Sequence, residues 1–138
     1  AKEAGFDNQK GLKTVKISCV KEQIRYTVDK FEVKAGQPVK LVFTNPDATP
    51  HNLAIVEPGT VEEIGMAANE LAKDPKEMAK GQFIPKSKAN KILHHTKMLA
   101  PDTVEVLRFK APKSPGVYPY MCTFPGHWII MKGEMIVK

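Results

Sequence analysis

The most informative part of the sequence is a short segment that reads Tyr120-Met-Cys-Thr-Phe-Pro-Gly-His-Trp-Ile-Ile-Met131. It contains a thiol at Cys122, an imidazole at His127 and a thioether at Met131, separated by four and then three residues. These side chains are soft or borderline metal ligands, and a tight loop would bring all three to one point. The segment therefore predicts a metal-binding loop between a strand that ends at Cys122 and a strand that begins near Gly133.

A metal held by this loop needs a fourth donor from elsewhere in the chain. The candidate is His51, in the stretch Ala48-Thr-Pro-His-Asn-Leu53, where a turn enters a strand and so reaches the end of a sandwich. Two imidazoles and a thiolate, with a weak axial thioether, suit copper in an electron-transfer site. A rigid compromise between Cu(I) and Cu(II) would let a single electron enter and leave quickly.

Two other chemistries use some of the same side chains. Zinc prefers four firm donors, and the thioether of Met131 is a poor one. A catalytic thiol activated by His127 is also conceivable. It leaves Met131 and His51 without a role, and no third residue is identified that would orient the histidine.

The composition fits one domain that spans residues 1–138. The chain is 42% hydrophobic, which is enough to bury a core without disulfides. No apolar run is long enough to cross a bilayer, and the polar segment at about 1–12 does not resemble a signal sequence, so we expect a cytosolic protein or one whose signal has been removed. The formal charge is +6, but the lysines are scattered, so we expect no nucleic-acid partner.

From Thr14 onward the chain alternates short apolar patterns with turn residues, which is typical of an antiparallel sandwich or barrel. Alternation places Val39, Leu41 and Phe43 on one buried face. The expected strands are Thr14–Val20, Gln23–Val28, Val39–Thr44, Asn52–Val56, Val104–Ala111, Gly116–Cys122 and Gly133–Val137.

Between about residues 60 and 81 the period changes from two to about 3.6, which predicts a short helical insertion over the sandwich. Thr60 and Glu63 fit a capping box at the start of a first helix. Asp74-Pro75 predicts the start of a second helix, and Gly81 its end.

The two cysteines, Cys19 and Cys122, could form one disulfide. If Cys122 binds a metal, Cys19 is left alone. Alternation places Cys19 on one face with Val15 and Ile17, where a buried and inert thiol would lie.

These motifs resemble those of the small blue copper proteins called cupredoxins, and among them the azurin and auracyanin group. The resemblance rests on Cys122-Thr-Phe-Pro-Gly-His127 followed by Met131-Lys-Gly133, on Pro50-His51-Asn52, and on His95-Thr-Lys97 before a strand. It covers about Val33 to Lys138, and the ligand loop is its most specific part.

The resemblance implies an all-β fold, an eight-stranded Greek-key β-sandwich with the metal near one end. It also implies a type 1 copper ion held by His51, Cys122 and His127, with Met131 as the long axial ligand. The disulfide that azurins carry near the amino terminus has no counterpart here, because its partner cysteine is missing.

Residues around the ligands are expected to support them. The side chain of Asn52 would connect the His51 segment to the Cys122 loop, and the backbone N–H groups of Asn52 and Phe124 would donate to the Cys122 sulfur, which raises the reduction potential. Gly126 allows a dihedral angle that His127 needs before it. His94 and His95 are adjacent on a strand and point to opposite faces, so we expect them to serve in packing or at the surface.

Apolar residues surround His127, among them Phe124, Trp128, Ile129 and Ile130. They predict an uncharged patch for a redox partner, or packing onto the end of the sandwich, with some of each expected.

The function expected from these observations is a single-electron carrier and not an enzyme. It would act as a monomer and dock near His127 with redox proteins such as cytochromes or membrane electron-transfer complexes. The alternatives are an electron-entry domain of a larger oxidoreductase and, less favoured, a metal-sequestering protein. By analogy with cupredoxins, we expect a location in the periplasm or on the extracytoplasmic face of the membrane, with a possible tether outside the present chain.

Overall fold

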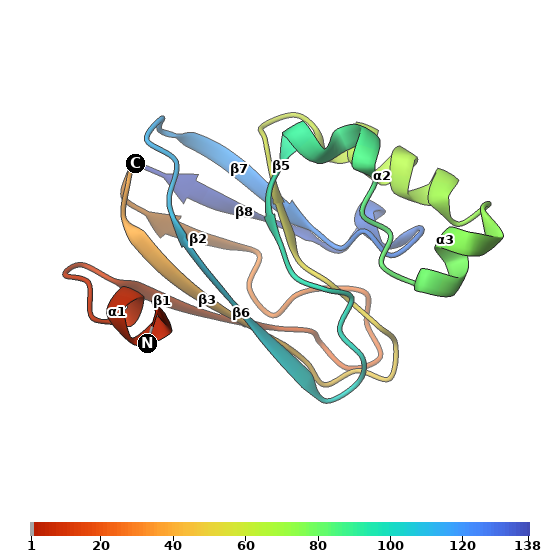
Figure 1. The fold of residues 1–138 in the computed structure, drawn as a ribbon, viewed down its shortest axis with the longest axis horizontal. Coiled ribbons are helices and arrows are strands. Elements are labelled where there is room, and N and C mark those ends of the chain that lie inside the picture. Colours follow the sequence, from red (N-terminus) through yellow and green to blue (C-terminus); the bar gives the residue numbers. More distant parts are fainter. Residues whose placement is uncertain (1) are drawn as a thin grey trace.

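Eight strands in two sheets form the body of the protein in the computed structural model, which describes residues 2–138 (Figure 1). The strands are β1 (Lys13–Ser18), β2 (Lys30–Val33), β3 (Pro38–Asn45), β4 (Ala54–Val56), β5 (Ile92–His95), β6 (Thr103–Lys110), β7 (Gly116–Met121) and β8 (Lys132–Val137). One sheet has the order β1-β3-β6 and the other β2-β8-β7-β4-β5. Strand β1 runs parallel to β3 and β2 parallel to β8, while the remaining pairs are antiparallel. The prediction of an eight-stranded β-sandwich is confirmed.

The core between the two sheets comes from the alternation read in the sequence. Val39, Leu41 and Phe43 in β3 are completely buried. Cys19, just beyond β1, is buried with Val15 and Ile17, as expected. Both cysteines are free, so the alternative of a disulfide is wrong.

The strand predicted at Gln23–Val28 is wrong. In this segment only Tyr26 pairs, in an isolated bridge with Cys19, and Glu22 has a left-handed backbone with φ 63°. The alternation of apolar residues suggested a strand, but Ile24 is 39% exposed and does not belong to the buried core. The second strand is β2 instead, and β5 was not among the expected strands.

The helical insertion comprises α2 (Val61–Leu71), α3 (Pro75–Lys80) and a 3-10 helix, η1 (Lys86–Lys91). The predicted start and end of α3 are confirmed, because the Asp74 side chain accepts a hydrogen bond from Lys76 N and Gly81 has φ 67°. The capping box at Thr60 is wrong. The Thr60 hydroxyl donates to Glu57 O at 2.7 Å, and Glu63 pairs with Lys91 instead.

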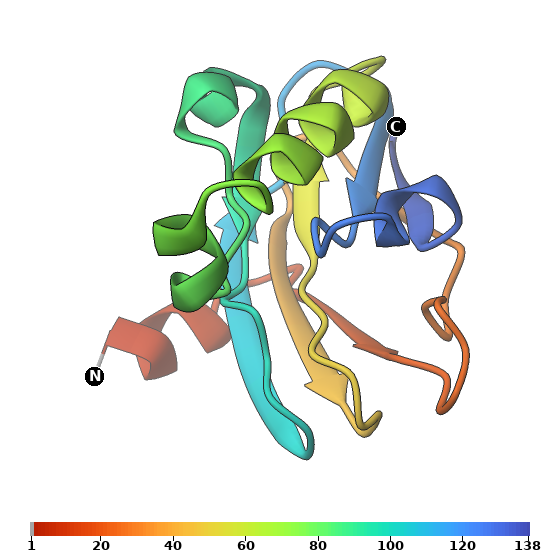
Figure 2. The same cartoon turned by 90° about the vertical axis from the view of Figure 1, so that its right-hand side faces the viewer.

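The insertion packs against one end of the outer face of the five-stranded sheet (Figure 2). Ile64 of α2 belongs to a second buried cluster with Ala54, Val56 and Met121 of that sheet. Gly65 lies so close to the Trp128 ring that a Cβ there would overlap it. The helices are therefore tied to the loop that joins β7 to β8, and in Figure 1 both lie at the right-hand end of the sandwich.

A short helix, α1 (Lys2–Asp7), lies within the polar segment predicted at about 1–12. Asp7 forms ion pairs with Lys40 of β3 and Arg108 of β6, which fasten α1 to the three-stranded sheet. Within residues 2–138, no helix has the length and apolar character needed to traverse a lipid bilayer.

Candidate metal centre

The loop between β7 and β8 is closed by backbone hydrogen bonds. Cys122 N donates to Met131 O at 3.1 Å, and Met131 N donates to His127 O at 2.8 Å. Gly126 adopts the left-handed backbone expected before His127, with φ 83°. Three of the predicted ligands therefore lie in one compact loop.

His51 reaches the same end of the sandwich from the segment between β3 and β4. Its backbone N donates to Leu99 O at 3.3 Å, and Leu99 N donates to His51 O at 2.8 Å. Asn45 Nδ2 also donates to Leu99 O at 2.9 Å. These bonds fix the backbone that carries the imidazole.

The side chains of His51, Cys122 and His127 converge in the interior. Cys122 Sγ lies 3.9 Å from His51 Nδ1 and 3.7 Å from His127 Nδ1, and all three donor atoms lie within 4.8 Å of one another. Among residues 2–138 this is the one group of three or more histidine, cysteine or acidic side chains with such spacing. Met131 is also completely buried, and its backbone is bonded to both Cys122 and His127.

Burial disfavours charge on Cys122 and His127. It raises the pKa of the Cys122 thiol to about 11, although the N–H groups of Asn52 and Phe124 that point at the sulfur oppose the shift. Burial and the neighbouring His51 lower the pKa of His127 to about 4. His127 is thus a neutral base with a free lone pair near neutral pH, and a thiolate at Cys122 needs a cation to compensate it.

The expected support by Asn52 is confirmed. Asn52 Nδ2 donates to Thr123 Oγ1 and Thr123 N donates to Asn52 Oδ1, both at 2.8 Å. The two segments that carry His51 and Cys122 are therefore joined directly by a pair of buried hydrogen bonds.

The apolar residues around His127 divide between core and surface, as expected. Phe124 stacks on the His127 ring at 4.4 Å between centroids, and Trp128 packs against α2. Ile129 and Ile130 are 58% and 62% exposed. The exposed pair leaves an apolar surface beside a ligand that is itself only 8% exposed.

Two supporting residues were missed in the sequence. Asp47 Oδ2 lies 2.9 Å from His51 Nε2, although Asn45-Pro-Asp47 was interpreted only as a turn. Asn69 of α2 accepts hydrogen bonds from Gly126 N at 3.0 Å and Trp128 Nε1 at 3.3 Å. An acidic residue four positions before the histidine was a possible signal for Asp47, whereas nothing local marked Asn69.

His94 and His95 do not belong to the metal centre. The His94 ring stacks on Phe109 with centroids 4.6 Å apart, and His95 Nδ1 lies 2.8 Å from Thr96 O. These are the packing and surface roles expected for the pair.

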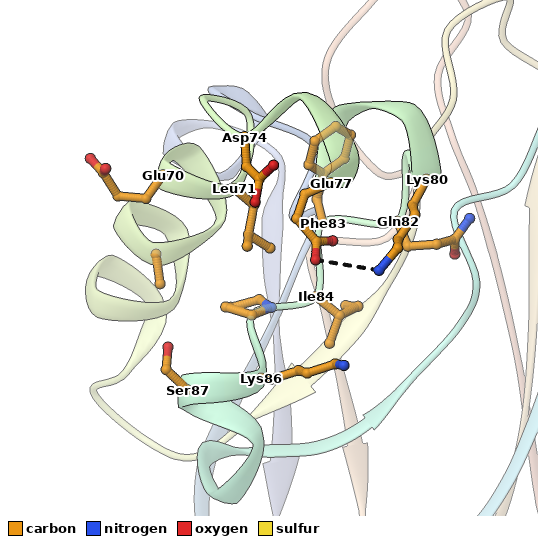
Figure 3. Close-up of a pocket in the computed structure, with 12 residues that line it drawn as sticks. Glu70, Leu71, Asp74, Glu77, Lys80, Gln82, Phe83, Ile84, Lys86 and Ser87 are labelled. Carbon is orange, nitrogen blue, oxygen red and sulfur yellow. Dashed lines mark ion pairs between the residues drawn. The ribbon is translucent and has the colours of Figure 1, made fainter.

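A groove of about 630 Å³ lies beside the centre, between α2, α3 and residues 82–87 (Figure 3). The ion pair between Glu77 and Lys80 lies at its edge, with 3.6 Å between nitrogen and oxygen. Phe83, which lines the groove, contacts the Phe124 ring edge-on at 5.6 Å. None of the candidate metal ligands lines this groove.

The donor set fits copper. It offers two imidazole nitrogens and one sulfur from buried side chains, with a buried thioether in the same loop. Imidazole and thiolate together satisfy both valences of copper, while the thioether is a weak donor that zinc uses poorly.

Comparison with known proteins gives the same indication. The chain is 33% identical over 129 residues to auracyanin-A of Chloroflexus aurantiacus, covering 93% of this chain and 76% of that protein. It is 29% identical over 133 residues to auracyanin-B of the same organism, covering 94% of this chain and 54% of the relative. The chain thus spans only about half the length of auracyanin-B.

Solved structures share the fold. Reduced auracyanin from Roseiflexus castenholzii superposes with a TM-score of 0.74 at 34% identity, over 91% of this chain and 96% of that one. The family model for copper binding proteins of the plastocyanin/azurin family matches residues 13–138. The chain therefore belongs to the plastocyanin/azurin family of copper-binding proteins.

Proposed function

We propose that His51, Cys122 and His127 bind one copper ion, with Met131 as a weak axial ligand, and that the chain carries single electrons through this site. The observation that supports the assignment is the convergence of the three donor atoms within 4.8 Å in a buried pocket. Met131 is assigned because it is buried in the same loop and supplies the soft axial donor that such a site uses.

As a member of its family, the chain is a blue copper electron carrier and not an enzyme. Copper held there would supply a one-electron couple between Cu(I) and Cu(II). The protein holds the donors in place: Asn52 connects the two ligand segments, and the closed loop fixes Cys122 and His127. A fixed cage reduces the rearrangement that accompanies each electron transfer.

An electron carrier has redox partners, and we place their docking surface at Ile129 and Ile130, close to His127. The exposed apolar pair and the mild charge of +6 suit weak and transient contact. Cytochromes or membrane electron-transfer complexes are the proposed partners. We place the protein outside the cytoplasm, in the periplasm or on the outer face of the membrane.

The test is the visible absorption and electron paramagnetic resonance of the copper-loaded protein and of two serine variants. Wild type should show an intense blue band and a narrow copper hyperfine splitting, because both arise from the thiolate bond. Cys122→Ser should lose both signals. Cys19→Ser is the matched control and should keep them, because Cys19 lies in the core and outside the metal centre.

A colourless wild type that takes up zinc in preference to copper would contradict this function. That result would favour the metal-sequestering alternative.

A further inference from the structure

The two histidines of the metal centre differ in their surroundings. Phe124 stacks on the ring of His127. The ring of His51 instead contacts the carboxylate of Asp47, whose Oδ2 atom lies 2.9 Å from Nε2. Because Nδ1 of His51 lies toward the Cys122 sulfur, Nε2 is the nitrogen left to carry the proton and donate to Asp47.

Asp47 is itself held firmly. Its Oδ1 atom accepts hydrogen bonds from Glu22 N at 3.1 Å and from Ala48 N at 2.9 Å, so Oδ2 remains for His51. Its own backbone N donates to Asn45 Oδ1 at 3.0 Å. The side chain is only 9% exposed, and one of its three donors, Glu22 N, comes from a different loop. A carboxylate with this many donors is ionised and oriented.

Glu22 reaches Asp47 from the loop between β1 and β2, where a strand was wrongly predicted. Its backbone is left-handed, with φ 63°, a conformation that non-glycine residues adopt rarely. Glu22 therefore adopts an unfavourable backbone angle at the position where its N–H donates to the Asp47 carboxylate.

We infer that Asp47 is a positioning residue that fixes the Nε2–H tautomer of His51 and lowers the reduction potential of the metal centre. This inference rests on the proposed function. A carboxylate bonded to the far nitrogen of an imidazole increases the donor strength of the near nitrogen. A buried negative charge one imidazole away from the ion also favours the valence with the higher charge, Cu(II).

The test compares Asp47→Asn with wild type. The asparagine oxygen can keep the bonds from Glu22 N and Ala48 N, but the negative acceptor at His51 is removed. The affinity for Cu(II) should fall about tenfold relative to that for Cu(I), which corresponds to an increase in reduction potential of about 59 mV for one electron. The blue band should remain, because Cys122 is unchanged.

Glu22→Gln is the matched control. It also removes one negative charge, from the neighbouring loop between β1 and β2, but the Glu22 side chain is exposed and its hydrogen bond to Asp47 comes from the backbone N. Its potential should stay near that of wild type. An unchanged or lowered potential in Asp47→Asn, with the blue band intact, would overturn the inference and leave the ligand assignment standing.

A second measurement needs no variant. In the reduced wild-type protein, proton nuclear magnetic resonance should show the Nε2–H proton of His51 far downfield and slow to exchange, as a buried bond to a carboxylate requires. A rapidly exchanging proton at an ordinary shift would overturn the inference, even if Asp47→Asn fails to fold. A wild type without the blue band would instead contradict the ligand assignment, and the inference with it.

Discussion

Cys122 shows how single residues prepare this site for a metal. Burial raises the pKa of its thiol to about 11, while N–H groups of Asn52 and Phe124 stabilise the negative sulfur. The site thus contains hydrogen-bond donors for a thiolate. Its apolar surroundings nevertheless disfavour that negative charge unless a cation is bound beside it. When a metal ion supplies the compensating positive charge, the hydrogen bonds from Asn52 and Phe124 help to stabilise the thiolate of Cys122.

Replacing Met131, the expected axial ligand, should change the reduction potential more than the fold. Met131→Leu keeps the volume and apolar character of a fully buried side chain, so the fold should lose less than about 1.5 kcal/mol of stability. The blue colour should remain, and the reduction potential should rise because a weak donor to Cu(II) is removed. The measurement is a redox titration followed at the blue band. Complete loss of copper would show that Met131 is a firm ligand.

The candidate ligands were predictable from sequence because three of them lie within ten residues and match a specific family motif. Asn52 was predictable because it adjoins His51. Asp47 was not recognised, since an aspartate after Asn45-Pro46 satisfies an ordinary turn equally well. Its role depends on Glu22, which is 25 residues away and has no local signal of its own.

At the scale of elements, the helical insertion and the ligand loop form one packed unit. Asn69 of α2 receives hydrogen bonds from Gly126 and Trp128, and Trp128 packs over Gly65. The insertion therefore restrains the loop on the side away from the sandwich core. Helix α2 contributes to the metal centre although it supplies no ligand.

This contact predicts the behaviour of Asn69→Ala. Two donors of the ligand loop lose their acceptor, which should cost about 1–2 kcal/mol. The effect should be local: faster amide hydrogen exchange at residues 122–131 and faster release of copper to a chelator. Asn90→Ala, at an exposed position on η1, is the control. Equal exchange and release rates in both variants would show that α2 does not restrain the loop.

The elements that were predictable are those with a continuous core behind them. In β1, β3, β7 and β8, buried residues alternate with more exposed ones along most of the strand. The segment Gln23–Val28 alternates polar and apolar residues in its sequence, but it forms no strand, and its buried Tyr26 instead donates its hydroxyl to Asn52 O at 2.7 Å. The prediction of a capping box was wrong because Glu63 forms ion pairs with two lysines of η1. The sequence of α2 alone does not show that these lysines lie nearby.

In the whole molecule, the loop between β7 and β8 lies at the right-hand end of the sandwich in Figure 1, and this loop carries three of the ligands together with the exposed apolar pair Ile129 and Ile130. Two copies of a chain with a charge of +6 repel each other, so close approach requires a surface without added charge. The uncharged surface beside His127 therefore suits brief encounters in which the electron passes through the His127 side chain. The single-domain organisation over residues 1–138 stays a prediction.

The apolar surface can be tested without knowing a partner, through electron self-exchange between oxidised and reduced copies. Ile130→Lys should slow self-exchange about tenfold or more, because each encounter brings two added charges together. Val117→Lys adds the same charge to an exposed position of β7 near its first residue, far along the strand from Cys122. Nuclear magnetic resonance line widths of mixed samples give the rates, and equal slowing by the two variants would contradict a docking surface at Ile130.

If a thiolate and two imidazoles from distant parts of the chain hold one copper ion, the cage should keep its shape in both valences. This can be measured by X-ray absorption at the copper edge, on the oxidised and then on the reduced protein. We predict one sulfur and two nitrogen neighbours at bonding distance in both states, with little change between them. A copper ion surrounded only by nitrogen and oxygen, or one that changes its number of close neighbours on reduction, would contradict the claim.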